Sequence, residues 1–418
     1  MINALKKHAA FGFVFTVAKA LVYFTPLLLA DVLSTSDYGI LEYALAGLGV
    51  IVNTLINLGV PGAYPYFIIR EKKDNLKTGF SLHPIVLLLP FIINQLAFLF
   101  LSLDVNFYLA FNISYIIANQ IFYSTQLKSH EKSSYAVILD SGIYIILFLF
   151  FIGYETGLFE PSITAINRIV LVYALFYAVI GVLRYVKSEK QNITSHYKTI
   201  LKFSVHLLIS TFLIFLITTS GRILVEFFFG FDEVGIYAFY FRLAAIVVMI
   251  HQIINIAFFK KIYTFSPLIL DQYFYKFFFI IAALSIVIYF VSPFVVSEFS
   301  NFFNDTFETY KSIYFLLSAQ MIMWIASALN SNIIDRENSA KINNIFFLIL
   351  ISCISLILFL FKDVFSFPQL IYVHFTTIYL ASMIQYYTLS KKKIYFKKSA
   401  ISLTIIFILQ SCYYFLYF

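Results

Sequence analysis

The chain has 418 residues, of which 61% are hydrophobic and only 12% are charged, and its mean hydropathy is +0.89. The charged fraction is about half that of soluble proteins, so there are too few polar side chains to cover a soluble globule, and we predict an all-α polytopic membrane protein. The formal net charge of +8 does not indicate nucleic-acid binding, because the cations are spread over short loops.

The N-terminal part holds two long apolar runs, residues 9–33 and 39–69, with a short polar turn between them. Each run exceeds the roughly 20 residues that a helix needs to cross a bilayer, so together they predict a transmembrane hairpin. The second run could reach about 45 Å, against an apolar core of about 30 Å. Gly59, Pro61 and Gly62 lie in its lower half, and proline interrupts helical hydrogen bonds. We therefore predict a bent or tilted helix, in which these residues form either a hinge or a tolerated kink.

Further apolar runs follow to the end of the chain. The runs predict twelve spans and a thirteenth apolar segment, at residues 9–33, 39–69, 82–103, 107–126, 136–153, 163–183, 203–229, 235–259, 277–298, 311–334, 343–361, 368–389 and 399–417. If the N-terminus is cytoplasmic and the spans alternate, the cytoplasmic loops hold most of the 29 Lys and Arg residues. This bias obeys the positive-inside rule and supports both the orientation and the number of spans.

The longest basic loop, residues 184–202, has six predicted spans on each side. We therefore expect an N-terminal six-helix bundle at residues 1–190 and a C-terminal six-helix bundle at residues 191–390. Residues 391–418 are expected to form a basic loop and a C-terminal hydrophobic helix, which either crosses the membrane as a thirteenth span or lies in its interface.

A short motif in the first hairpin has a counterpart in the second half of the chain. Residues 38–43 and 234–239 both contain the pair Gly-Ile, and each segment stands just after a polar turn that closes an apolar run. Repeats in equivalent positions of two halves are typical of secondary transporters, whose binding site lies between the repeats. The motif therefore favours two pseudo-symmetric bundles.

Three cations remain inside the predicted spans: Lys19, Arg222 and Arg242. A cation at a helix centre in the bilayer costs at least about 2.5 kcal/mol, so each should face a wet cavity or a partner. Arg222 and Arg242 both lie roughly 10 Å below the outer surface by the helical rise. We interpret them as a cationic lining that receives an anionic substrate. The alternative is a salt bridge between Arg222 and Glu226, with an Arg242 side chain that reaches outward to the headgroups.

Lys19 lies near the predicted midplane, where it could meet a substrate phosphate or a coupling carboxylate. Candidates for coupling or for tuning the site are Glu226, Asp140 and His251. Four amides either hold helices together or line a polar cavity: Asn53 and Asn57 in the second span, and Gln252 and Asn255 in the eighth.

The sequence contains no catalytic constellation and no metal-ligand spacing, and Cys353 and Cys412 both lie in apolar runs. The predicted outer loops are too short to hold a catalytic domain. We therefore expect a protein that is not an enzyme and that needs neither a metal nor a cofactor.

The opening hairpin resembles a known group of transporters. The turn at residues 33–40, followed by Asn-Leu-Gly-Val-Pro at residues 57–61, resembles Wzx-type O-antigen and polysaccharide flippases of the MATE-like (MOP) exporter superfamily. The resemblance extends to the order of spans over most of the chain and is clearest over residues 1–70 and about 220–245.

This resemblance implies two six-helix bundles around a central cavity in a bacterial inner membrane. The implied cargo is an undecaprenyl-pyrophosphate-linked oligosaccharide, moved from the cytoplasmic to the periplasmic leaflet by ion-coupled alternating access. The implied protein partners are the O-antigen polymerase and the chain-length regulator. The thirteenth apolar segment departs from the usual twelve spans of such proteins.

Two other functions are consistent with a chain of this kind. A MATE-like multidrug or small-molecule antiporter would share the fold but would favour an acidic site, and the cations inside the spans argue against it. An O-antigen polymerase would be an enzyme of similar length and aromatic content. Such polymerases need large outer loops with cationic residues, and the outer loops predicted here are short and nearly free of cations.

Overall fold

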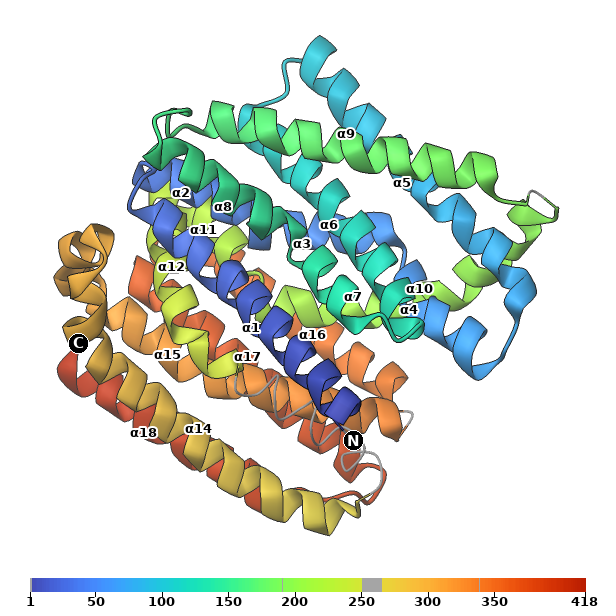
Figure 1. Ribbon diagram of the computed structural model, residues 1–418. Coiled ribbons are helices and arrows are strands. Elements are labelled where there is room, and N and C mark those ends of the chain that lie inside the picture. The colour runs from blue at the N-terminus through green and yellow to red at the C-terminus, as the bar shows by residue number, and fades with distance from the viewer. Residues whose placement is uncertain (1, 190, 250–264, 338) are drawn as a thin grey trace. The chain divides into compact units, whose positions relative to one another are not determined.

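The structure, a computed structural model, describes residues 2–189, 191–249, 265–337 and 339–418, with side chains in the first helix described from Phe11 onward (Figure 1). Every regular element in these ranges is a helix. Nine helical segments among the described residues are long and apolar enough to cross a membrane, and a bent pair, Ser133–Asp140 with Gly142–Glu155, would make a tenth. The prediction of an all-α polytopic membrane protein is therefore confirmed.

The chain divides into two compact units, residues 1–212 and 213–418, called unit 1 and unit 2 below. The division falls inside one helix, α10 (Ile193–Thr218). The domain boundaries expected at residues 190 and 390, and the separate segment 391–418, stay predictions.

Unit 1 begins with the predicted hairpin, and its helices follow the order of the predicted apolar runs. These are α1 (Ile2–Ala30), α2 (Thr35–Ala46), α3 (Leu48–Asn57), α4 (Val60–Tyr64), the π-helical turn η1 (Pro65–Arg70), the 3-10 turn η2 (Asp74–Leu76), α5 (Lys77–Phe100), α6 (Val105–Ser129), α7 (Ser133–Asp140), α8 (Gly142–Glu155), α9 (Ile163–Lys187) and most of α10.

Unit 2 continues from the end of α10. It contains α11 (Gly221–Phe229), α12 (Phe231–Ala244), α14 (Pro267–Val295), the 3-10 turn η3 (Val296–Glu298), α15 (Asn301–Arg336), α16 (Ala340–Leu360), α17 (Phe367–Ser390) and α18 (Lys397–Tyr417). The last of these, the predicted thirteenth segment, is among the nine candidate spans.

Each predicted apolar run coincides with at least one helix, although the run 235–259 continues into residues outside the described ranges. Two runs, 107–126 and 368–389, coincide with α6 and α17, which are long enough to span but are not among the nine candidates. Both helices bury many polar side chains, which lower their hydropathy. The predicted helices are present, while the total of twelve spans stays a prediction.

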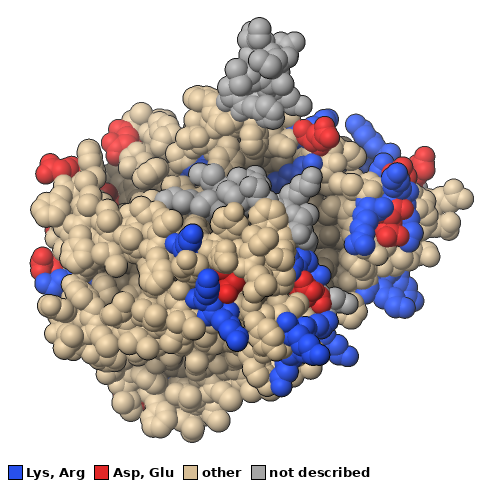
Figure 2. Space-filling model, turned by 90° about the horizontal axis from the view of Figure 1, so that it is seen from below, with Lys and Arg blue, Asp and Glu red and all other residues tan. Residues whose placement is uncertain are grey.

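One helix forms the centre of each unit. In unit 1, α6 packs against α2, α3, α5, α7 and α9. In unit 2, α15 packs against α12, α14 and α17, and 83% of an 18-residue apolar stretch of α15 is buried. By contrast, exposed positions on the outer helices are apolar, as Phe176 and Val179 of α9 are. Wide areas of the face in Figure 2 carry no charged side chain, which suits contact with lipid.

The second predicted span is interrupted, as its glycines and proline indicate. α2 begins at the polar turn, where the Ser34 side chain accepts a hydrogen bond from the Asp37 N–H at 3.1 Å. The helix breaks between α3 and α4, because Leu58 and Gly59 both adopt left-handed conformations, with φ of 53° and 69°. Pro61 lies in the first turn of α4, where a missing N–H costs no helical hydrogen bond. The hinge role stays a prediction.

We expect Gly59→Ala to destabilise the protein and Gly62→Ala to have a much smaller effect. A Cβ at Gly59 would clash with the carbonyl oxygen of Ser204. The alanine would also have to keep the left-handed backbone conformation, which costs about 1–2 kcal/mol. At Gly62 a Cβ would meet only Leu207 Cδ1, at 3.2 Å, which is the end of a flexible side chain. Thermal unfolding in detergent should show a loss of at least about 4 °C for the first variant. Equal melting temperatures for the two variants would contradict this account.

Candidate functional site

Arg222 and Arg242 are buried inside unit 2, with 3% and 7% of each residue exposed. Arg222 lies in the first turn of α11, and Arg242 lies near the end of α12, which packs against α11. The two helices meet at Gly230, whose φ of 100° is readily adopted only by glycine. The short helical hairpin therefore holds two guanidinium groups below the surface of one unit, as the sequence predicts.

Aromatic rings of α12 hold the Arg222 side chain. The guanidinium carbon lies 4.9 Å from the centroid of the Phe241 ring and 5.7 Å from that of the Tyr237 ring, which are cation–π distances. Gly221 allows this approach, because a Cβ there would clash with the Tyr237 hydroxyl. Phe241 directly precedes Arg242, so the contact brings the Arg222 side chain to the end of α12 that carries Arg242, while the depth of the two arginines in the membrane stays a prediction.

His374 of α17 stabilises the helix break that precedes Arg222. α10 ends at Thr218 and α11 starts at Gly221, so carbonyl groups at the end of α10 lose their helical partners. The buried His374 Nε2 lies 3.0 Å from the Ile217 carbonyl oxygen. Because a carbonyl oxygen can only accept a hydrogen bond, His374 Nε2 carries the proton and donates the hydrogen bond to Ile217. The sequence analysis missed this residue, although a histidine inside the predicted span 368–389 was a usable signal.

Gln320 adds an amide to the interior of unit 2 beside the arginine. It lies on α15, is fully buried, and is next to the Tyr237 side chain. Among the described residues, neither of its amide atoms has a hydrogen-bond partner within normal geometry. A buried amide of this kind is costly unless water or a ligand satisfies it. Glu226 is half-buried one turn after Arg222 on α11, and its tuning role stays a prediction.

Lys19 is half-buried in unit 1, on α1, which packs against α7 and α8. Its Nζ lies 5.8 Å from the Phe15 ring centroid, and it is within electrostatic range of Asp140. Asp140 itself accepts a hydrogen bond from Lys128 Nζ at 2.6 Å in a half-exposed ion pair. The structure thus brings two of the predicted residues into one charged group with a third member, Lys128, which lies between the predicted spans 107–126 and 136–153.

The amides of the second span are buried and bonded locally. Asn53 donates to the carbonyl oxygen of Gly49 at 2.9 Å. The Asn57 oxygen lies 3.4 Å from His83 Nε2, and the other ring nitrogen of His83 lies 3.0 Å from the Tyr197 hydroxyl. His83 of α5 therefore links Asn57 of α3 to Tyr197 of α10, and the Asn57 contact fits a role in holding helices together. His251, Gln252 and Asn255 lie outside the described residues.

A row of buried polar side chains on α6 was not singled out in the sequence analysis. Its members are spaced three or four residues apart and thus share one helix face, and we call them the α6 polar stripe: Asn112, Tyr115, Asn119 and Tyr123. Each is at most 5% exposed, and each has one side-chain polar atom without a hydrogen-bond partner among the described residues. The spacing of polar residues within an apolar run was the available signal.

One end of the stripe meets a hydroxyl network between α6 and α9. The Gln120 amide donates to the Tyr173 hydroxyl at 3.3 Å, and that hydroxyl lies 3.2 Å from the Tyr177 hydroxyl. The Tyr123 and Tyr177 rings are stacked, and the Arg184 guanidinium lies 4.4 Å from the Tyr123 ring centroid. The interior of unit 1 is therefore polar and rich in aromatic rings along the α6–α9 contact.

We expect Tyr123→Phe and Tyr177→Phe to differ in stability. Among the described residues the Tyr123 hydroxyl has no hydrogen-bond partner, so its removal should not lower the free energy of unfolding. Removal of the Tyr177 hydroxyl breaks the contact with Tyr173 and should cost about 1 kcal/mol. Denaturant or thermal unfolding of both variants gives the comparison. A larger loss for Tyr123→Phe would mean that its hydroxyl has a structural partner, such as a bound water.

Within the described ranges, no group of three or more His, Cys, Asp or Glu side chains could hold a metal ion. Cys353 and Cys412 are free and exposed. The buried polar side chains of this part of the chain include arginines, carboxylates, histidines, amides and hydroxyls.

A helical bundle with an apolar exterior and this polar interior defines a multi-pass membrane protein. The family model for polysaccharide biosynthesis proteins matches residues 5–260, which is more than half of the chain. The chain therefore belongs to the polysaccharide biosynthesis protein family, and the resemblance to polysaccharide exporters is confirmed at that level. Searches of curated proteins and of solved structures found no match.

Proposed function

We propose that the protein is a flippase that moves an undecaprenyl-pyrophosphate-linked oligosaccharide, of the O-antigen repeat type, across a bacterial inner membrane. Family membership supports a role in handling polysaccharides or lipid-linked sugars. The observation that carries the proposal is the burial of Arg222 and Arg242 in a short helical hairpin of unit 2.

A pyrophosphate must lose its water when it passes through the membrane, and arginine replaces that hydration well. Its planar guanidinium group can donate two parallel hydrogen bonds to phosphate oxygens. In unit 2 the Tyr237 and Phe241 rings contact the Arg222 guanidinium, and Gln320 supplies an amide nearby. Such a cluster suits an anionic headgroup followed by polar sugars, whereas a carrier of organic cations would need negative charge there.

The other predicted residues have roles that depend on this cargo. Lys19 is proposed to attract the same headgroup from unit 1, with Asp140, Glu226 or His251 as coupling groups for an ion. The helix break at Gly59 is proposed to act as a hinge in alternating access. We further propose a cytoplasmic N-terminus, no catalytic activity, and contact with the O-antigen polymerase and chain-length regulator.

The proposal is tested with Arg222→Ala and Arg242→Ala in a strain that lacks the chromosomal copy. Loss of a charge-assisted contact with phosphate costs about 2 kcal/mol, so glycan display at the cell surface should fall about 30-fold in rate. Arg222→Lys keeps the charge but loses the bidentate geometry and should retain part of the activity. Lys311→Ala, which removes an exposed cation paired with Glu308 at 2.9 Å, is the matched control and should leave display unchanged.

Membrane levels of each variant are measured by immunoblot, so that lost display is not confused with lost protein. Full display in both arginine-to-alanine variants would overturn the cationic-pocket hypothesis. In the strain without any copy, accumulation of undecaprenyl-linked single repeats at the inner leaflet supports a flippase. Single repeats attached to the lipid A core would instead indicate a polymerase, and normal display with altered drug sensitivity would indicate a small-molecule antiporter.

A further inference from the structure

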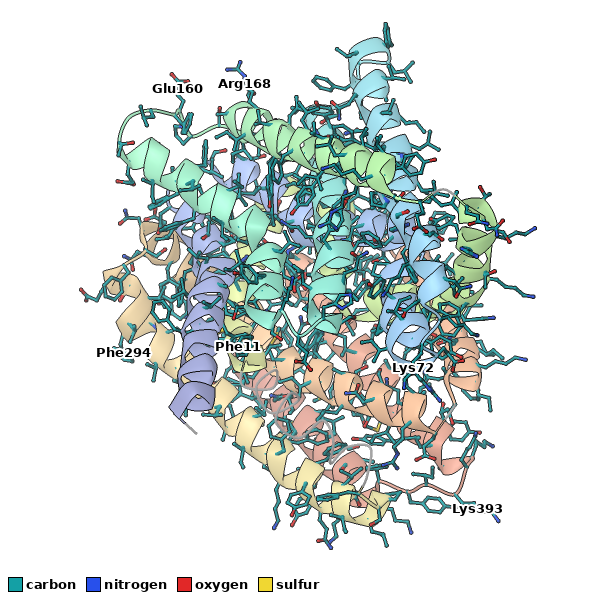
Figure 3. All side chains as sticks on the ribbon, turned by 45° about the vertical axis from the view of Figure 1, so that its right-hand side comes forward. Phe11, Lys72, Glu160, Arg168, Phe294 and Lys393 are labelled. Carbon is teal, nitrogen blue, oxygen red and sulfur yellow. The ribbon has the colours of Figure 1, made fainter. Side chains whose placement is uncertain are left out.

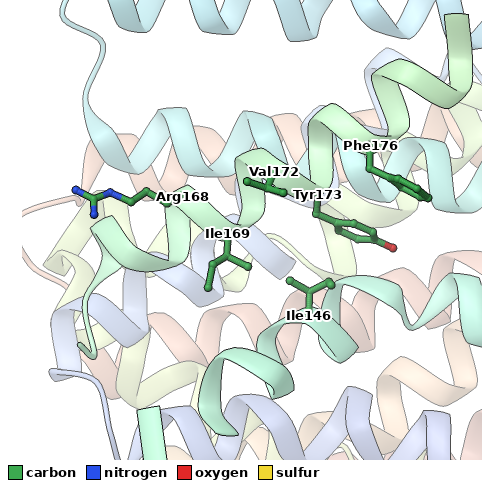
Figure 4. Close-up of a pocket in the computed structure, with 6 residues that line it drawn as sticks. All are labelled: Ile146, Arg168, Ile169, Val172, Tyr173 and Phe176. Atoms are coloured by element: carbon green, nitrogen blue, oxygen red, sulfur yellow. The ribbon is translucent and has the colours of Figure 1, made fainter. Parts of the chain in front are cut away.

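A groove of about 480 Å³ runs along the outside of unit 1 between α8 and α9 (Figure 4). We call it the α8–α9 groove, and its lining residues are Ile146 of α8 and Arg168, Ile169, Val172, Tyr173 and Phe176 of α9. Val172 and Phe176 are 69% and 55% exposed, so the groove opens away from the interior of the unit. Such an apolar surface suits contact with lipid.

The groove has a charge at one end only. Arg168 lies near the start of α9 and its exposed side chain extends away from the row of apolar residues, at the edge where Glu160 also projects (Figures 3 and 4). At the other end, the Tyr173 hydroxyl is engaged by Gln120 and Tyr177. Only the ring of Tyr173 is therefore left to line the groove, which is an apolar channel that ends at a cation.

The length of the groove along α9 matches the depth of about one leaflet of the bilayer. α9 has 25 residues, enough to cross the whole apolar core, and the lining runs from its sixth residue to its fourteenth. The distance along the helix from Arg168 to Phe176 is about 12 Å, close to the depth of one leaflet. An occupant would therefore have its charged group at the level of Arg168 and its chain directed toward the bilayer centre.

We propose that the α8–α9 groove binds a polyprenyl phosphate or pyrophosphate, with the phosphate on Arg168 and the isoprenoid chain along Ile146, Val172 and Phe176. A phosphate matches the guanidinium in charge and geometry. The groove has one helix face on each side and thus suits a single chain, whereas a two-chain phospholipid would leave one chain outside it. The choice of a polyprenyl lipid rests on the proposed function.

This site differs from the buried arginines of unit 2, because it holds the carrier by its tail in the leaflet beside unit 1. With a cytoplasmic N-terminus, that leaflet is the outer one. The groove would then retain the carrier after translocation, when the headgroup has left the interior. Retention on the protein raises the local concentration of the carrier for the next step.

The test uses the purified full-length protein in detergent, with undecaprenyl phosphate as the probe and native mass spectrometry as the readout. Val172→Trp fills the groove, and Arg168→Gln removes its cation; each should weaken binding at least tenfold. Val179→Trp is the matched control, because Val179 lies on the same helix, is 57% exposed and does not line the groove. It should bind as the wild type does.

Two further probes show whether the phosphate and the polyprenyl chain each contribute to binding. Undecaprenol, which lacks the phosphate, should bind the wild type more weakly than undecaprenyl phosphate, and Arg168→Gln should remove that difference. Phosphatidylglycerol should bind at least tenfold more weakly than undecaprenyl phosphate. Equal binding of the two anionic lipids, or unchanged binding in Val172→Trp, would overturn the proposal.

Failure here can be told apart from failure of the proposed function. The Arg222→Ala variant should keep binding undecaprenyl phosphate in the groove while it loses glycan display. If display survives in the unit 2 variants while Val172→Trp loses lipid binding, the flippase pocket is wrong and the groove is supported. If display is lost in those variants and lipid binding is insensitive to Val172→Trp and Arg168→Gln, the groove is wrong and the flippase proposal is supported.

Discussion

The structure depends on the cost of leaving a polar group without a partner in hydrocarbon. Helices satisfy their backbone groups internally, which is why the described elements are all helical. The remaining polarity comes from side chains and from helix ends, and most of it is directed into the two units. At the break before α11, for example, a histidine from a distant part of the chain supplies the donor that the Ile217 carbonyl needs. Along α6, where some buried polar atoms have no hydrogen-bond partner among the described residues, a water molecule or a ligand would satisfy them.

The polar interiors are organised differently in the two units. In unit 1, amides and tyrosine hydroxyls follow the contact between α6 and α9, and the charged group is formed by Lys19 of α1, Asp140 of α7 and Lys128 in the last turn of α6. In unit 2 two buried arginines lie on a short hairpin, and aromatic rings contact one of them, Arg222. Both arrangements place polar groups behind an apolar exterior, which is what a protein needs if an amphipathic molecule is to pass without exposing its polar part to lipid.

The sequence predicted those features that depend on local physics. Run length and hydropathy locate the helices, and the cost of a buried cation singles out Arg222 and Arg242. The interruption near Gly59 follows from glycine and proline in an overlong run. Features that depend on which helix faces which could not be predicted. The pairing of Asp140 with Lys128 crosses a loop, and the α8–α9 groove exists only because Ile146 happens to face one side of α9. The α6 polar stripe could be predicted in part, since the spacing of its residues is visible in the sequence but their burial is not.

The position of Arg222 at the beginning of α11 has an electrostatic consequence. Aligned peptide dipoles give the first turn of a helix a partial positive charge of about half an elementary unit, and its first N–H groups point away from the helix. The partial positive charge of this turn repels the Arg222 cation. The side chain and the main chain therefore both contribute positive potential here. Neutralising the Arg222 side chain would remove only its own contribution, and the partial positive charge of the first turn of α11 would stay in place.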